Sequence, residues 1–258
     1  MDVDRHIAAL EAEGRLLAEA AERAGLTAAV PSCPAWQVRD LVRHQGYVHR
    51  WAGAYVSVPI RAEAPELTEA EQLACPPADD RLLEWFRDGH GSLIRALRSA
   101  DPGVIAWTFL GAPSPLAFWA RRQAHETAIH RADAQLAAGQ APGYDPDFAA
   151  DGVDELIMGF FARSGAVAGP DGEPARDRTL LIRASDAGRE WRAELSADGG
   201  RVAQVSRGSG PAACTLDGPA SGLYLLLWNR SDAVAAGVSV SGDDELAAAW
   251  RTGMHVRW

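Results

Sequence analysis

The segment Trp119–Leu136, WARRQAHETAIHRADAQL, has the residue spacing of a single helix, and the N-terminal half of the chain is organised around it. Residues three and four positions apart lie on one face of a helix. One such row holds Trp119, Gln123, Glu126, His130 and Asp133, and a second, mostly apolar row holds Phe118, Arg122, His125, Ile129 and Leu136. Because Glu126 and His130 are one turn apart, their side chains can meet at one point. Carboxylate and imidazole are common ligands of zinc and related divalent metals.

The same segment nearly matches the H-E-x-x-H motif of zinc proteases, but it contains one residue too many. His125 and His130 are five positions apart, which separates them by about 140° around a helix. They cannot both face one ion, so the spacing favours Glu126 with His130 and places His125 elsewhere. Glu/His pairs of this kind also occur on solvated helix surfaces, and a metal site therefore requires a third ligand.

Composition narrows the class of protein. The chain has 258 residues, of which 47% are hydrophobic and 23% charged, and this suits one large or two small globular domains. A net charge of −10 without a basic stripe argues against a nucleic-acid partner. We find no membrane-spanning run and no secretory signal. Three scattered cysteines, Cys33, Cys75 and Cys214, indicate reduced thiols in a cytoplasmic protein.

The first half of the chain predicts four amphipathic helices. They span Val3–Ala24, Ala35–Val56, Arg81–Leu97 and Ser114–Ala138, with Pro34 at the start of the second helix. A short helix at Glu69–Leu73 and a short apolar piece at Ala106–Leu110 lie between them. Four such helices predict a four-helix bundle, in which metal sites are built from residues on facing helices.

Two histidines on the second predicted helix are candidates for the third ligand. His44 lies in a mostly apolar row, and His49 lies in the neighbouring row. A buried histidine needs a partner, so each is either a hydrogen-bonded core residue or a ligand. Periodicity leaves both alternatives open.

The pattern changes after the linker Gly139–Pro146. A helix is expected at Asp147–Arg163, and an apolar helix at Gly218–Trp228. Short strands are expected at Thr179–Ala184, Glu190–Leu195, Arg201–Ser206 and Val238–Ser241, with turns at Asp186–Gly188 and Asp198–Gly200 and a final helix at Asp243–Arg251. The fold class is therefore α+β with two domains, residues 1–142 forming the bundle and residues 146–258 a small α+β domain.

Several segments resemble the mycothiol-dependent maleylpyruvate isomerase family. They are Ser32–His44 (SCPAWQVRDLVRH), Gln123–Asp133 (QAHETAIHRAD), Leu225–Arg230 (LLLWNR) and the closing Val240–Trp250. The resemblance implies a DinB-like helical bundle followed by a domain similar to sterol carrier protein 2. It also implies that His44, Glu126 and His130 are the metal ligands. Arg230 matches an arginine that holds a substrate carboxylate, although a solvated arginine after a buried helix is an equal alternative.

The resemblance implies a metalloenzyme, with zinc as the expected divalent metal and mycothiol as thiol cosubstrate. Two histidines and one glutamate leave a fourth zinc position open, as in catalytic sites. The expected reaction is addition of a thiolate to a small electrophile, as an isomerase or an S-transferase, by a monomer or small homo-oligomer. The alternatives are a metallohydrolase on the same bundle and a non-catalytic binding protein. Asp133 either orients His130 or pairs with a surface charge.

Overall fold

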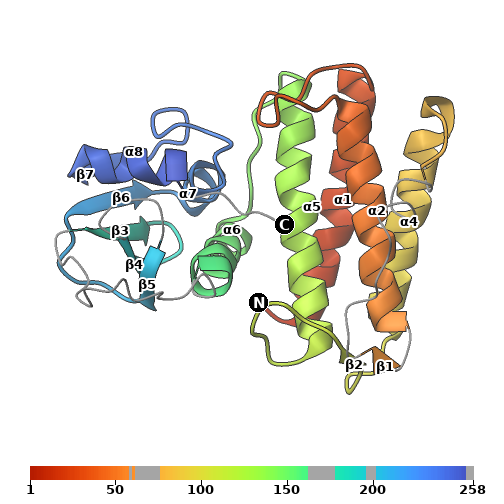
Figure 1. Cartoon of the computed structure of the whole chain (residues 1–258), viewed down its shortest axis with the longest axis horizontal. Helices are drawn as coiled ribbons and strands as arrows, with labels where there is room; N and C mark the ends of the chain where they lie inside the picture. The colour runs from red at the N-terminus through yellow and green to blue at the C-terminus, as the bar shows by residue number, and fades with distance from the viewer. Residues whose placement is uncertain (58–59, 62–75, 162–177, 196–201, 254–258) are drawn as a thin grey trace, which may run out of the picture. The chain divides into compact units, whose positions relative to one another are not determined.

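The computed structural model describes residues 1–57, 60–61, 76–161, 178–195 and 202–253. The chain divides into two compact units, Met1–Pro142 and Gly143–Trp258, and each is described by itself (Figure 1). The first unit is helical and the second contains a five-stranded sheet, which confirms the predicted two-domain α+β class. Among the described residues, no helix is both long and apolar enough to cross a bilayer.

The first unit is built from four long helices. They are α1 (Val3–Ala24), α2 (Val38–Ser57), α4 (Asp79–Ser99) and α5 (Pro115–Ala137), and two short parallel strands, β1 (Ile60–Arg61) and β2 (Ile105–Ala106), pair beside them. The helices pack as two close pairs, α1 with α5 and α2 with α4, and α2 makes a smaller contact with α5. The bundle predicted from the four amphipathic segments is therefore present.

Helix α5 is the central helix of this unit. Ser114 caps its N-terminus by accepting a hydrogen bond from the backbone N–H of Ala117, and Pro115 occupies the first turn, where its missing N–H costs nothing. Its residues are buried on all sides from Leu116 to Ala134, although many of them are charged. Buried charges need partners, and α5 provides several of its own.

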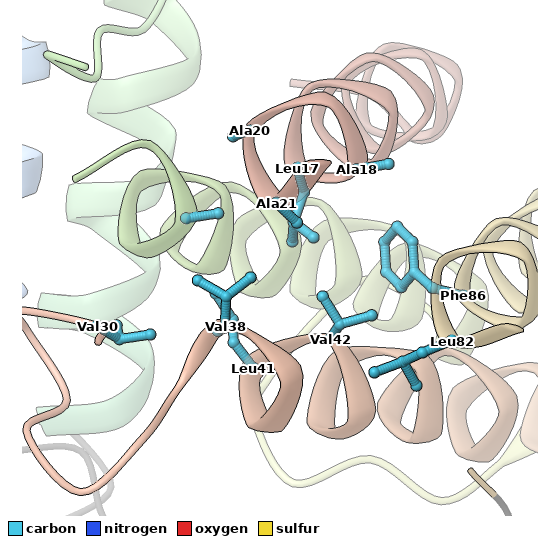
Figure 2. Packing of buried hydrophobic residues seen from close by; sticks show 11 residues of the cluster. Leu17, Ala18, Ala20, Ala21, Val30, Val38, Leu41, Val42, Leu82 and Phe86 are labelled. Carbon is cyan, nitrogen blue, oxygen red and sulfur yellow. The ribbon is translucent and has the colours of Figure 1, made fainter. Parts of the chain in front are cut away.

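An apolar cluster holds α1, α2 and α4 together near one end of the bundle. Its members are Leu17, Ala18, Ala20, Ala21, Val30, Val38, Leu41, Val42, Leu82, Phe86 and Ala134, and Figure 2 shows how they meet between the helices. Val30 belongs to the loop of residues 25–37, so the cluster also anchors that loop. Cys33 and Trp36 of the same loop pack against the cluster.

The predicted start of the second helix is wrong by three residues, because α2 begins at Val38 rather than at Ala35. The backbone of the preceding loop pairs with itself instead: the N–H of Val30 donates to Trp36 O, and that of Val38 donates to Ala28 O. Pro34 therefore lies in a turn and does not begin the helix. Helix α1 has the predicted ends, and α4 and α5 differ from the prediction by one or two residues at each end.

The second unit opens with α6 (Pro146–Asp154), which continues as a π-helix, η1 (Glu155–Phe161). The helix predicted over Asp147–Arg163 is thus present as far as Phe161, although its form changes from α to π at Glu155; residues 162 and 163 lie outside the described residues. A five-stranded sheet follows, in the order β5-β4-β3-β6-β7, with β3 and β6 parallel and the other neighbours antiparallel. Its strands are β3 (Thr179–Ala184), β4 (Arg189–Leu195), β5 (Val202–Arg207), β6 (Cys214–Gly218) and β7 (Ser239–Gly242).

Helix α7 (Ala220–Leu227) connects β6 to β7 and packs against α6 and the sheet, and α8 (Asp244–Gly253) ends the described chain. The predicted turn at Asp186–Gly188 is present, and Gly188 there has a φ of +62°, which favours glycine. The predicted helix Glu69–Leu73, the turn Asp198–Gly200 and Cys75 lie outside the described residues. Cys33 and Cys214, the cysteines that are described, are free thiols.

Candidate metal centre

The structure brings His44, Glu126 and His130 together. His44 comes from α2, and Glu126 and His130 come from one face of α5. Each offers one ligand atom, and these atoms all lie within 4.8 Å of one another. Glu126 Oε1 is 3.5 Å from His44 Nε2 and 3.3 Å from His130 Nε2.

These separations match a shared metal ion. Nitrogen and oxygen ligands bind zinc at about 2.0–2.2 Å in a tetrahedral arrangement, which places two ligand atoms about 3.4 Å apart. The two distances from Glu126 Oε1 to the imidazole nitrogens bracket that value. The His44 side chain is 28% exposed, whereas Glu126 is 5% exposed. The cluster is therefore buried on the α5 side and reachable from solvent beside His44.

One carboxylate oxygen of Glu126 is engaged away from the two imidazoles. Its second oxygen, Oε2, accepts a hydrogen bond of 2.8 Å from Arg122 Nη2, one turn earlier on α5. Burial by itself would raise the pKa of Glu126, but hydrogen bonds from His130 and His44, with the charge of Arg122, hold that pKa well below its usual value. The carboxylate is therefore ionised at neutral pH, with Oε1 directed toward both imidazoles.

Asp133 orients His130. Its Oδ2 lies 2.9 Å from His130 Nδ1, and its Oδ1 accepts a hydrogen bond from Ser32 Oγ. Of the two alternatives that the sequence left open, the structure therefore shows the orienting contact. A carboxylate on Nδ1 fixes the ring and leaves Nε2 for a metal. Burial alone would lower the pKa of His130, but hydrogen bonds to Asp133 and Glu126 raise it to about 9.

The loop of residues 25–37 forms one wall of the site. The indole of Trp36 lies 5.2 Å from the His44 ring and 6.2 Å from the His130 ring, centroid to centroid. Ser32 of the same loop reaches Asp133. Because Val30 anchors this loop in the apolar cluster, the packing of the bundle fixes the position of both side chains.

The other histidines of these helices lie outside this cluster. His49 is fully buried and contacts Thr127 Oγ1 and Gln45 Nε2, each at 2.9 Å. His125 is also buried, and its ring lies edge-on to that of His6 at 6.0 Å. The ligand set therefore remains a prediction for His44, Glu126 and His130, and the structure supplies the geometry that supports it.

Arg230 lies in the second unit, just after α7. Its backbone N–H donates to Leu225 O at 2.8 Å, and its Nη1 donates to Trp228 O at 2.7 Å. The preceding residue, Asn229, has a φ of +59°, a conformation that asparagine tolerates better than most side chains. The guanidinium is half-buried and held by the end of its own helix, and its role with substrate stays a prediction.

Some residues of the site were not predicted from the sequence. Arg122 was assigned to the mostly apolar row, but its i, i+4 spacing to Glu126 is the signal that reveals a buried ion pair. Ser32 and Trp36 reach the site through the folding of a loop, and no local pattern indicates this. The sequence indicates a role for them only in that both belong to Ser32–His44, a segment that resembles the family described above.

Comparisons with known proteins identify the family of the chain. Residues 7–135 match the family model described as mycothiol maleylpyruvate isomerase N-terminal domain, and residues 147–249 match the MDMPI C-terminal domain. No curated protein matches the sequence at a significant level.

Two solved structures are similar in fold. One is a crystal structure of the mycothiol-dependent maleylpyruvate isomerase, with a TM-score of 0.59 and 14% identity. The other is the structure of a histidine-to-alanine mutant of a protein with that name, with a TM-score of 0.62 and 13% identity. Both alignments cover 93% of each chain. At such low identity the likeness concerns the fold.

Proposed function

Because this chain belongs to the mycothiol-dependent maleylpyruvate isomerase family, we propose that it is a zinc-dependent enzyme that uses mycothiol as cosubstrate. Its substrate is a small electrophile with a conjugated double bond, and the reaction is isomerisation or S-transfer. The supporting observation is the meeting of His44, Glu126 and His130 at separations that suit one ion. Three protein ligands are typical of catalytic zinc sites, whose remaining position binds water or substrate.

The residues around the three proposed ligands suit the binding of a thiol to a metal ion held there. A divalent ion held there would favour the thiolate form of a bound thiol, because its charge stabilises the anion. Asp133 keeps His130 Nε2 directed at the cluster, and Arg122 keeps Glu126 from turning both oxygens toward it. Partial exposure of His44 provides the side from which thiol and substrate enter.

The chemistry of the thiolate accounts for both reactions. Addition of the sulfur to one carbon of a cis double bond moves the π electron pair onto the conjugated carbonyl, and a rotatable single bond remains. Return of that pair expels the thiolate and gives the trans isomer. In an S-transfer, the adduct instead takes up a proton and is released. The thiol is regenerated in the first case and consumed in the second, so the two are separated by measuring free thiol.

Metal content and thiol dependence test this proposal together. We expect elemental analysis of the purified protein to give about one zinc ion per chain, as expected for one three-ligand site. We expect turnover of maleylpyruvate or a related cis electrophile only when mycothiol is present, and its loss after chelation. Turnover without thiol would favour a metallohydrolase instead. A metal-free protein that still binds small molecules would favour a non-catalytic binding role.

Metal uptake should also depend on pH. In the metal-free protein the pKa of His130 is raised to about 9, so this ring carries a proton at neutral pH. A metal ligand must be neutral, and uptake at pH 7 should therefore release about one proton from His130. The apparent affinity should fall about tenfold for each pH unit below 9. Calorimetry in buffers of different ionisation enthalpy measures the released protons.

The Asp133→Asn variant is the control for this measurement. It removes the carboxylate whose hydrogen bond most strongly raises the pKa of His130. Proton release at pH 7 should then be smaller than in the wild type. Uptake at pH 7 without any released proton would contradict the assignment of His130 as a ligand.

A further inference from the structure

Three polar side chains are fully buried where α2 meets α5: Gln45, His49 and Thr127. Thr127 Oγ1 lies 3.1 Å from Gln45 Nε2 and 2.9 Å from His49 Nε2, and Gln45 Nε2 lies 2.9 Å from His49 Nε2. We call them the Gln45–His49–Thr127 cluster. It forms a closed set of contacts between the two helices, with one hydroxyl on α5 and two side chains on α2.

The cluster lies directly beside the candidate ligands in the sequence. Gln45 follows His44 on α2, and Thr127 follows Glu126 on α5. A movement of α2 along α5 that separated Gln45 from Thr127 would therefore also move His44 away from Glu126. The contacts of the cluster and the distance from His44 to Glu126 therefore both depend on how far α2 is displaced along α5.

The two helices belong to different close pairs of the bundle. His44 belongs to the α2–α4 pair, and Glu126 and His130 belong to the α1–α5 pair, while the direct contact between α2 and α5 is smaller. Apolar packing tolerates small sliding movements because it is not directional. Metal binding does not tolerate such movements, because the distances from ligand atoms to the metal must hold within about 0.2 Å. The contacts of Gln45 and His49 with Thr127 are directional and join α2 to α5.

Apolar side chains in place of the Gln45–His49–Thr127 cluster would be expected to give a more stable fold. His49 Nδ1 and Gln45 Oε1 have no hydrogen-bond partner within the part of the chain that the structure describes. Buried polar atoms without partners destabilise a fold, and apolar side chains of similar shape would avoid that cost. Burial also lowers the pKa of His49 well below its usual value, so its ring is neutral. General stability therefore does not explain why three polar residues are buried between α2 and α5.

We propose that Gln45, His49 and Thr127 are positioning residues, which lock α2 against α5 and so hold His44 at ligand distance from Glu126. This inference rests on the proposed metal site. It assigns no contact with the metal, thiol or substrate to the cluster. Its effect is transmitted through the relative position of the two helices.

The Thr127→Val variant tests this role, with Thr127→Ser as matched control. Valine keeps the shape of threonine but removes the hydroxyl, whereas serine keeps the hydroxyl. We expect the Kd for Co²⁺, used as a spectroscopic probe, to rise about 10- to 100-fold in Thr127→Val, as for other losses of residues that orient ligands. Thr127→Ser should stay close to wild type. The visible absorption of bound Co²⁺ should change in Thr127→Val only, because it reports the ligand geometry.

A second control separates positioning from stability. Leu17→Ala truncates the apolar cluster on α1 and should lower the free energy of unfolding of the metal-free protein, while its Kd for Co²⁺ stays unchanged. If Thr127→Val binds Co²⁺ as wild type does, or if Leu17→Ala weakens binding equally, the positioning role is overturned. If the wild-type protein takes up no Co²⁺, both this role and the proposed metal site fail.

Gln45→Met provides the second variant if Thr127→Val does not fold. It removes the amide that contacts both Thr127 and His49 while keeping a side chain of similar length. The direct contact of His49 with Thr127 remains, so we expect the Kd for Co²⁺ to rise, but by less than in Thr127→Val. If neither variant folds without metal, the cluster is required for folding and the positioning role is overturned.

Discussion

Replacing Glu126 should weaken metal binding by more than about a hundredfold, because loss of a residue that merely orients a ligand already costs about 10- to 100-fold. His44→Ala and His130→Ala should have the same effect, since each removes one of three ligand atoms. Glu126→Gln is the sharper variant. It keeps the shape and an acceptor for Arg122, whereas alanine would remove the carboxylate that pairs with that buried guanidinium. Metal content after dialysis and the Kd for zinc measure the result.

The matched control is His125→Ala, on the same helix and next to Glu126. His125 is buried, like Glu126, but its ring lies beside that of His6. We expect this variant to keep its metal even if its stability falls. Equal metal loss in His125→Ala and in the three ligand variants would show that the assignment is wrong.

Replacing Arg230 should lower turnover about a hundredfold while metal and thiol binding remain. Loss of one charge-assisted, two-pronged contact with a substrate carboxylate costs about 2–3 kcal/mol, which corresponds to that factor in rate. Arg230→Lys should recover little of the activity, because an ammonium group cannot reproduce the planar fork of a guanidinium. Measurements of kcat/KM, with zinc content as the second readout, check the prediction.

A substrate analogue without the carboxylate provides the control. The wild type should turn over this analogue more slowly than the substrate. Arg230→Ala should turn over the analogue at the same rate as the wild type does. Arg183, whose guanidinium pairs with Glu190 and Asp217 in the same unit, is a comparison residue whose replacement should leave turnover unchanged. If Arg230→Ala turns over substrate as the wild type does, Arg230 has no part in the reaction.

The local pattern of α5 carried most of what could be predicted about the site. The i, i+4 spacing of Glu126 and His130 is a property of any helix, and it holds in the structure. Excluding His125 from this row rested on the same geometry. Arg122 followed the same spacing but was assigned to an apolar row, because periodicity alone does not distinguish a buried ion pair from core packing.

The choice between His44 and His49 needed information that one helix does not contain. Both side chains face the interior of the bundle, and each has a polar partner there. The two histidines differ in the residue of α5 that they contact: His44 contacts Glu126 and His49 contacts Thr127. Which residue each one contacts depends on how far α2 is displaced along α5. Only the resemblance to a family favoured His44, and the structure places it beside Glu126.

The start of α2 and the form of the helix after Asp154 were not predicted from the sequence. Pro34 is a good first residue for a helix, but backbone pairing between residues 28–30 and 36–38 delays the start of α2. The π-helix Glu155–Phe161 has no sequence pattern of its own that would separate it from an α-helix. At Pro34 the backbone pairing of the loop outweighs a local preference for helix.

The distribution of the ligand atoms over two helix pairs has a consequence for the bundle itself. His44 and Glu126 are 82 residues apart in the sequence, and the described part of the first unit has no disulfide between its helices. An ion shared by α2 and α5 would therefore join two segments that are far apart in the sequence, and it would stabilise the fold because it binds the folded chain and not the unfolded one. Metal supply would then set the lifetime of the folded protein as well as the amount of active enzyme.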